Sequence, residues 1–215
     1  MLENILFDLD GTLTDPMLGI TNSVMYSLEK MGFPVPDRKD LLCFIGPPLL
    51  YSYQTYCGMD PEQAQQAVDA YREYFGVKGL LENAVFPGVP EFLTRLRRQG
   101  KKLYIATSKP EGYTLRILEH FDLLRYFDGV AAATMDASRH TKDKVVTYCL
   151  ETFAIDPATA VMVGDREHDI QGGKVNGLRT VGVTFGYGPR QELEENGADA
   201  IADDFDELYN ILMEM

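Results

Sequence analysis

Cysteine is scarce in this sequence, and tryptophan is absent. The three cysteines among the 215 residues, Cys43, Cys57 and Cys149, lie far apart and form no CxxC pair. That usage does not suit a disulfide-rich secreted domain. We expect the three side chains to be small core residues of a protein in a reducing compartment.

Basic residues are also few. The chain has 20 lysines and arginines against 33 aspartates and glutamates, which gives a formal net charge of -13. Because binding to a nucleic-acid backbone needs a basic surface, this balance argues against a nucleic-acid partner. The same charge repels anionic substrates at long range, so an anionic substrate would need local positive charge or a metal ion to attract it.

Long hydrophobic runs are missing as well. No apolar stretch approaches the length that spans a bilayer. No signal peptide is evident at the N-terminus, because a motif with catalytic character already begins at residue 8. We therefore expect a cytoplasmic protein with no membrane partner.

The most informative stretch that is present begins with an apolar run, residues 5–7, which predicts a short buried strand. Two carboxylates, Asp8 and Asp10, follow directly, and Gly11 then breaks the strand. Two acids at the end of a buried strand are costly unless a divalent cation compensates them. One carboxylate could then attack phosphorus while the other transfers a proton. The alternative is an ordinary polar turn, in which Asp and Gly are common.

Strand-like and helix-like segments alternate over most of the chain, which predicts an α/β fold with a Rossmann-like, doubly wound parallel sheet covered on both faces. Residues 16–82 interrupt this alternation with helical patterns only, including a strong helix start at Asp60 and Pro61. We therefore expect an α/β core of residues 1–15 and 83–215, with an all-helical domain of residues 16–82 inserted after the first strand.

In parallel sheets, ligands bind beyond the carboxyl ends of the strands. Three of the expected strands end in residues that can carry chemistry. These residues are Asp8 and Asp10 after the first strand, Thr107, Ser108 and Lys109 after the strand over residues 103–106, and Asp165 and Asp169 after the strand over residues 161–163. The sequence thus predicts acids, hydroxyls and a lysine at one edge of the sheet.

The string Asp-Leu-Asp-Gly-Thr-Leu over residues 8–13 resembles motif I of the haloacid dehalogenase (HAD) superfamily of phosphohydrolases. Residues 107–110, Thr-Ser-Lys-Pro, resemble motif II, and residues 164–169, with two acids four apart, resemble motif IV. Lys142 is the best match to the motif III lysine, and Lys144 is its rival. The resemblance is nearest to phosphoglycolate phosphatase-like proteins with a helical cap, because residues 45–49 carry a Gly-Pro-Pro-Leu loop.

This resemblance implies a role for each matching residue. Asp8 would be the nucleophile that forms an aspartyl-phosphate, and Asp10 would protonate the leaving alcohol and then activate water. Thr107, Ser108 and Lys142 would bind the phosphoryl group. Mg²⁺ would be held by Asp8, by the backbone carbonyl of Asp10 and by Asp165. Asp169 would lie behind these ligands, holding metal-bound water or Lys142.

The function expected from the resemblance is Mg²⁺-dependent hydrolysis of a small phosphate ester, with phosphoglycolate as the nearest family substrate. A 5'-nucleotidase acting on nucleoside monophosphates is the alternative. A phosphomutase is less favoured, and a dehalogenase is disfavoured because dehalogenation needs no counterpart of Asp10. A non-catalytic binding module is a further alternative, against which the intact set of acids argues.

Overall fold

The computed structural model describes residues 2–136 and 138–215. Its contacts divide the chain into two compact units. The first, here called the α/β unit, comprises Met1–Asp15 and Val85–Met215, and the second, here called the helical unit, comprises Pro16–Ala84. The chain therefore leaves the α/β unit after Asp15 and re-enters it at Val85, and we call these two points the crossings.

The α/β unit is built on a six-stranded parallel sheet with the strand order β5-β4-β1-β6-β7-β8. Its strands are β1 (Asn4–Phe7), β4 (Lys102–Pro110), β5 (Gly129–Ala133), β6 (Ala160–Gly164), β7 (Arg179–Val183) and β8 (Ala200–Ala202). Two short strands, β2 (Thr14–Asp15) and β3 (Ala84–Val85), form a separate two-stranded sheet at the crossings.

Strand β1 lies inside the sheet between β4 and β6, so both of its faces are covered. Leu6 belongs to an apolar cluster with Val145 and Cys149 of one helix, whereas Phe7 packs edge-on against Phe92 of another, with ring centroids 5.9 Å apart. Because side chains of a strand alternate between faces, a strand with two covered faces must be apolar throughout. This requirement explains the uninterrupted run over residues 5–7.

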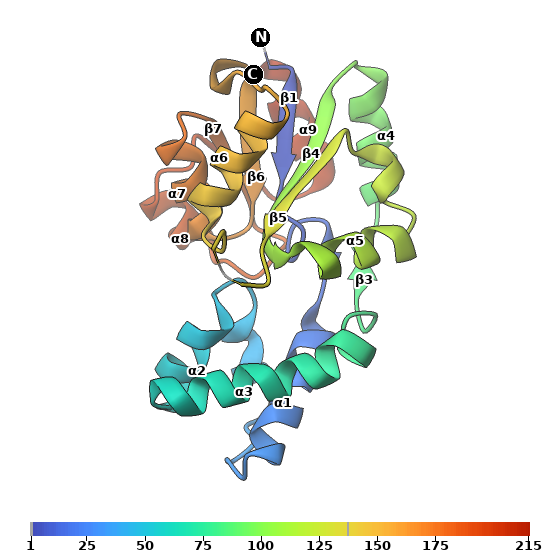
Figure 1. Cartoon of the computed structure of the whole chain (residues 1–215). Helices are drawn as coiled ribbons and strands as arrows, with labels where there is room; N and C mark the ends of the chain where they lie inside the picture. Colours follow the sequence, from blue (N-terminus) through green and yellow to red (C-terminus); the bar gives the residue numbers. More distant parts are fainter. Residues whose placement is uncertain (1, 137) are drawn as a thin grey trace. The chain divides into compact units, whose positions relative to one another are not determined.

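Helices lie on both faces of the sheet in Figure 1, with α6 and α7 packed together on one face and α4 and α9 on the other. The helices of this unit are α4 (Val89–Arg98), α5 (Glu111–His120), α6 (Lys142–Thr152), α7 (Glu167–Val175), α8 (Arg190–Glu195) and α9 (Phe205–Glu214), with single turns η3 (Leu124–Tyr126) and η4 (Pro157–Thr159). The α/β fold predicted from the sequence is confirmed, including the helical insert after the first strand.

The helical unit contains α1 (Met17–Lys30), η1 (Arg38–Phe44), α2 (Leu49–Cys57), α3 (Pro61–Tyr74) and the π-helical turn η2 (Phe75–Gly79). Helix α3 begins where the sequence predicts. Asp60 caps it by accepting a hydrogen bond from the Gln63 N–H, and Pro61 occupies the first turn, where its missing N–H costs nothing. Helices α1 and α3 pack closely, and the Tyr53 hydroxyl lies 2.5 Å from that of Ser27 in the interior of this unit.

Two local expectations differ from the structure. Strand β4 continues past Ala106 to Pro110, and its register against β5 shifts between Thr107 and Pro110. Of the cysteines, Cys149 is buried, whereas Cys43 and Cys57 are half-buried in the helical unit.

Within residues 2–136 and 138–215, no helix combines the length and the apolar character needed to cross a lipid bilayer.

Candidate active site

Asp8 and Asp10 lie where β1 ends and the chain turns. The Asp8 N–H donates to the Val163 carbonyl (2.9 Å), which extends the pairing with β6 by one residue. The chain then folds back, and the Thr14 N–H donates to the Leu9 carbonyl (3.0 Å). The turn brings both carboxylates to the carboxyl edge of the sheet, where the sequence predicts them.

Gly11 makes this turn possible for two reasons. Its φ of 80° lies in the left-handed region that side chains disfavour. A Cβ at this position would also lie 2.2 Å from Oδ2 of Asp165, far inside van der Waals contact. The turn after β1 therefore packs directly on the acid that follows β6.

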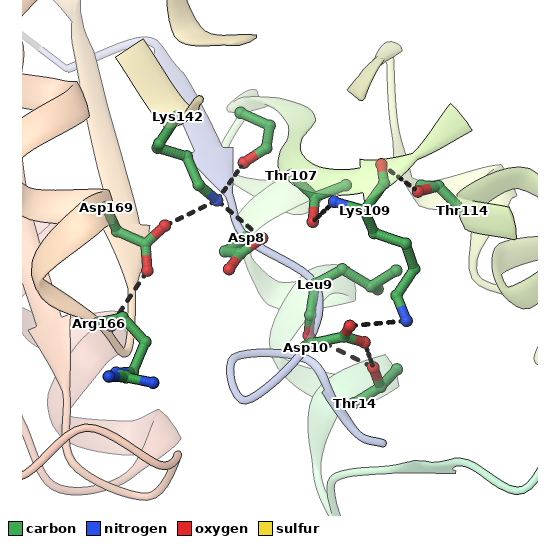
Figure 2. Close-up of polar contacts among 11 residues, drawn as sticks. Asp8, Leu9, Asp10, Thr14, Thr107, Lys109, Thr114, Lys142, Arg166 and Asp169 are labelled. Carbon is green, nitrogen blue, oxygen red and sulfur yellow. Dashed lines mark hydrogen bonds and ion pairs between the residues drawn. The ribbon is translucent and has the colours of Figure 1, made fainter. Parts of the chain in front are cut away.

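Lys142 binds three oxygens at the centre of the site, as Figure 2 shows. Its Nζ lies 2.8 Å from Oδ1 of Asp8, 2.7 Å from Oδ1 of Asp169 and 2.9 Å from the Ala106 carbonyl. Burial lowers the pKa of this ammonium, but Asp169 and Asp8 outweigh that effect and raise the pKa above its ordinary value, so the group stays charged. Lys144, the alternative motif III lysine, is exposed on the same helix.

Three acids form a cluster that could hold a metal ion. Asp8, Asp165 and Asp169 each offer an oxygen, and these oxygens lie within 4.8 Å of one another. Asp165 is 1 % exposed; its Oδ2 accepts a hydrogen bond from the Tyr187 N–H (2.8 Å), and its Oδ1 has no hydrogen-bond partner among the described residues. Burial, together with the charge of Asp169, raises the pKa of Asp165 to about 8.

These properties fit a divalent cation. A buried carboxylate oxygen without a partner is costly unless something neutralises it. Hard divalent cations prefer carboxylate oxygens, and a bound cation would keep the Asp165 carboxyl ionised. The cluster is therefore consistent with a divalent metal site, although its side chains are those of Asp8, Asp165 and Asp169 rather than Asp10.

Asp169 stands behind the other two acids. Its Oδ1 contacts Lys142, and its Oδ2 accepts a hydrogen bond from the Arg166 N–H (3.1 Å; Figure 2). Burial raises the pKa of this carboxyl, and the charge of Lys142 opposes that rise. Because both oxygens are already engaged, Asp169 is placed to orient Lys142.

The two hydroxyl residues at the end of β4 differ in burial. Thr107 is 2 % exposed, and its hydroxyl oxygen accepts a hydrogen bond from the Lys109 N–H (3.3 Å). An accepting hydroxyl keeps its own proton free to donate to an anion. Ser108 is half-buried beside it.

Lys109 is part of the site in a way that the sequence did not indicate. Its Nζ lies 2.7 Å from Oδ2 of Asp10, and the two side chains are 6 % and 14 % exposed (Figure 2). Burial raises the pKa of Asp10, and the Lys109 ammonium partly offsets this rise. The position of Lys109 after β4 was visible in the sequence, but its partner was not.

Tyr187 is the second residue that the sequence analysis missed. The backbone N–H of Tyr187 donates a hydrogen bond to Asp165, and the hydroxyl of Tyr187 donates one to Oδ1 of Asp15. The sequence did carry a signal for this residue, because residues 184–188 follow β7 and so must lie at the same sheet edge as the other residues of the candidate site.

With all four acids ionised, the charges of the site would not balance without a cation. Asp8, Asp10, Asp165 and Asp169 supply four potential negative charges, whereas Lys109 and Lys142 supply two positive ones. A divalent cation would balance that difference of two. Carboxylates that share a buried site otherwise repel one another, which raises their pKa values.

A comparison with protein families identifies the family to which this chain belongs. The model for haloacid dehalogenase-like hydrolases matches residues 5–183, which include all four acids and both lysines. The chain belongs to this family. It is a phosphatase of this family.

Individual relatives cover nearly the whole chain. A 5'-nucleotidase of Pseudomonas aeruginosa is 41 % identical over 97 % of this chain and 95 % of the relative. The tyrosine-protein kinase PtkA of Mycobacterium tuberculosis is 37 % identical over 97 % of this chain and 72 % of the relative. A phosphoglycolate phosphatase of Aliivibrio fischeri is 26 % identical over 98 % of this chain and 96 % of the relative.

Among solved structures, that of a predicted phosphatase from Clostridium acetobutylicum covers 100 % of both chains at 43 % identity, with a TM-score of 0.97. The names of the relatives differ in substrate but share phosphoryl chemistry. Membership of the HAD family therefore identifies the chain as a phosphatase and leaves its substrate open.

Proposed function

We propose that the protein is a Mg²⁺-dependent phosphomonoesterase that hydrolyses nucleoside 5'-monophosphates. The observation that carries the chemistry is the Asp8–Lys142–Asp169 ion-pair chain beside the unpartnered oxygen of Asp165. The substrate class rests on the relatives: the 5'-nucleotidase is 41 % identical, whereas the phosphoglycolate phosphatase is 26 % identical. This difference favours the nucleotidase over phosphoglycolate, the substrate first expected from the motifs.

In this proposal Asp8 is the nucleophile. One of its carboxylate oxygens forms a bond to phosphorus as the bond from phosphorus to the ester oxygen breaks, which leaves an aspartyl-phosphate. Lys142 contacts Oδ1 of Asp8 and so holds the carboxylate in a fixed orientation. An oriented, buried nucleophile loses little freedom on reaching the transition state.

Asp10 is the proposed acid and base. Its raised pKa favours a protonated carboxyl that can give its proton to the leaving alcohol. Once it has lost that proton, the same carboxylate can take one from the water that attacks the aspartyl-phosphate. Lys109 stabilises the ionised form between the two steps, because its ammonium lies 2.7 Å away.

Thr107, Ser108 and Lys142 are the proposed phosphoryl-binding residues. The Thr107 hydroxyl has a proton to donate, since its oxygen accepts the Lys109 N–H. Lys142 adds a positive charge that stays in place because the pKa of its ammonium is raised. Donors fixed before the reaction stabilise the charge that develops on the phosphoryl oxygens.

Asp8, Asp165 and the backbone carbonyl of Asp10 would hold Mg²⁺, and Asp169 would stay behind them on Lys142. When bound, Mg²⁺ would offset the repulsion between the carboxylates and the phosphate and polarise a phosphoryl oxygen. The helical unit is the proposed cap, which would exclude water from the reaction and select among phosphate esters.

A substrate panel tests this proposal. The purified protein with Mg²⁺ would be assayed for phosphate release from ribo- and deoxyribonucleoside 5'-monophosphates, a nucleoside 3'-monophosphate, phosphoglycolate and p-nitrophenyl phosphate. We expect kcat/KM for at least one 5'-monophosphate to exceed that for phosphoglycolate and for the 3'-isomer. The Asp8→Asn variant serves as the control for contaminating phosphatases.

The outcomes separate the two parts of the proposal. If phosphoglycolate is hydrolysed with the highest kcat/KM, the substrate class is wrong and the chemistry stands. If no ester is hydrolysed with Mg²⁺ present, the assignment of phosphomonoesterase activity is wrong.

A further inference from the structure

The segment Phe185–Tyr187, which follows β7, contacts four parts of the α/β unit that lie far apart in the sequence. The backbone N–H of Tyr187 donates to Oδ2 of Asp165 (2.8 Å), and its hydroxyl bonds to Oδ1 of Asp15. Asp15 is the last residue before the chain leaves the α/β unit. A single tyrosine therefore links an acid of the cluster to the outgoing crossing.

The same segment also contacts the returning crossing. The Phe185 ring packs edge-on against Phe86, with centroids 5.9 Å apart, and Phe86 follows the residue at which the chain re-enters the unit. Phe86 itself is tied to the outgoing side, because its N–H donates to the Leu13 carbonyl (3.1 Å). Both crossings thus meet one short segment after β7.

Phe185 continues into a row of aromatic rings. Its centroid lies 4.7 Å from that of Phe205, which lies 5.1 Å from that of Phe92, which in turn lies 5.9 Å from that of Phe7. Phe7 directly precedes Asp8. Aromatic contacts at these separations are favourable beyond the area that they bury. The row gives the returning crossing a packed connection to the strand that carries the nucleophile.

The segment has little room to move away from the acids. A Cβ at Gly186 would lie 2.3 Å from the Gly11 carbonyl oxygen and 2.4 Å from Cβ of Asp165. The backbone at Gly186 is therefore wedged between the turn after β1 and the cluster acid. Burial and the bond to Asp15 raise the pKa of Tyr187, so its hydroxyl keeps the proton that it donates.

We propose that Phe185–Tyr187 is a positioning segment that couples the Asp165 carboxylate to both crossings of the chain. Tyr187 holds the outgoing crossing and Phe185 holds the returning one. A cation held by Asp165 would keep its carboxylate ionised and in place, so that the Tyr187 N–H would retain a fixed, charged acceptor. Binding at the acid cluster would thereby reduce the freedom of the two crossings.

Hydrogen exchange followed by mass spectrometry tests this coupling in the full chain. The Thr14 and Phe86 amides are hydrogen-bonded within the α/β unit, so their exchange reports the opening of each crossing. Tyr187→Phe removes only the hydroxyl and keeps the hydrogen bond from the backbone N–H of residue 187 to Asp165. Because hydrogen bonds to charged groups are among the stronger ones, we expect exchange over residues 12–16 to become at least about tenfold faster.

Phe185→Leu removes the ring contact, and we expect faster exchange over residues 84–88. Phe185→Tyr keeps the ring and should behave like the parent protein. Tyr126→Phe is the matched control, since it removes a surface tyrosine hydroxyl that bonds Arg125, remote in sequence from both crossings. These measurements are made without metal, so they do not depend on the proposed function.

The second arm adds Mg²⁺ alone and rests on the proposed metal site. In the parent protein, Mg²⁺ should slow exchange at both crossings. In the double variant of Tyr187→Phe and Phe185→Leu, calorimetry should still detect Mg²⁺ binding, because Asp165 and its N–H donor are intact, but exchange at the crossings should no longer respond.

Parent-like exchange of both single variants without metal would overturn the proposal. An unchanged Mg²⁺ response of the double variant would overturn the coupling. If the parent protein binds no Mg²⁺, the metal assignment under the proposed function fails, and the metal-free arm still decides whether the segment holds the crossings.

Discussion

Lys109 and Asp10 form a buried ion pair beside the proposed nucleophile, with Nζ 2.7 Å from Oδ2. Lys109 belongs to β4, and Asp10 lies in the turn after the neighbouring strand β1. The pair gives the proposed acid and base an electrostatic partner that is separate from Lys142. Each of the two proposed catalytic aspartates thus has its own lysine.

The first prediction concerns this pair. Lys109→Met removes the ammonium that lowers the pKa of Asp10, so the pKa of this carboxyl should rise further. More of Asp10 is then protonated at neutral pH and cannot act as a base. We expect kcat to fall by about tenfold or more. In the plot of kcat against pH, the acidic limb should move to higher pH. Lys102→Met, at the exposed start of β4, is the control and should leave the profile in place. An unmoved acidic limb in Lys109→Met would contradict the role given to the pair.

The second prediction tests the nucleophile. Asp8→Asn changes little volume and leaves Lys142 paired with Asp169, so the melting temperature with EDTA present should remain near that of the parent protein. Turnover should fall below detection because no carboxylate oxygen can attack phosphorus. Intact-mass spectrometry after acid quenching should find a phosphorylated fraction in the parent protein and none in the variant. Near-normal hydrolysis by the purified variant would rule out covalent catalysis at Asp8.

The third prediction separates the two half-reactions. Asp10→Asn removes both the acid and the base, and general acid–base groups typically contribute about 10²–10⁴-fold to rate. With p-nitrophenyl phosphate, whose leaving group needs little protonation, the first step should be less affected than the second. The phosphorylated protein should then accumulate in a single turnover. A loss smaller than about tenfold in both steps would move this role to another residue.

The fourth prediction is a dependence of stability on pH and metal. The pKa of Asp165 is raised to about 8 in the folded protein, against about 4 for an ordinary Asp. The folded protein therefore binds more protons than the unfolded chain between these values, so the contribution of Asp165 to stability decreases as pH rises through this window. Mg²⁺ requires the ionised carboxyl, and its stabilising effect should increase over the same window.

Thermal unfolding at pH 6, 7 and 8, with Mg²⁺ and with EDTA, measures both effects. The increase in melting temperature on adding Mg²⁺ should be larger at pH 8 than at pH 6. Asp165→Asn removes the titrating group and is expected to lose most of this increase. Equal Mg²⁺ effects at pH 6 and pH 8 in the parent protein would show that Asp165 does not control binding.

The fifth prediction concerns the central lysine. Lys142→Met leaves the carboxylates of Asp8 and Asp169 buried without their shared cation, and breaking a buried ion pair by removing one partner typically costs about 3–5 kcal/mol. Urea unfolding should detect this loss in the free energy of unfolding. Lys144→Met on the same helix is the control, because this side chain is exposed. Equal stabilities of the two variants would mean that the ion-pair chain contributes little.

The sequence predicted those parts of the fold and site that depend on local pattern. The apolar run over residues 5–7 indicated a strand covered on both faces, and the acids after it had to lie at the sheet edge. The helix start at Asp60 followed from the chemistry of caps and of proline. These inferences need only a few neighbouring residues, and for that reason they could be made without a structure.

Contacts between distant residues could not be predicted in the same way. The partner of Lys109 depends on how the end of β4 shifts its register between Thr107 and Pro110. The bond from Tyr187 to Asp15 joins residues 172 positions apart, and it depends on the path of the turn after β7. No local pattern encodes these contacts between side chains, because they depend on how several strands pack together.

The backbone at two glycines packs directly against the side chain of Asp165. A methyl group at Gly11 would meet Oδ2 of Asp165, and a methyl group at Gly186 would meet its Cβ. A glutamate at position 165 would keep the charge but would need room for one more methylene, which the backbone on both sides denies. In this site, volume restricts substitution as strongly as charge does, and the side-chain length of an acid determines where its oxygens can be.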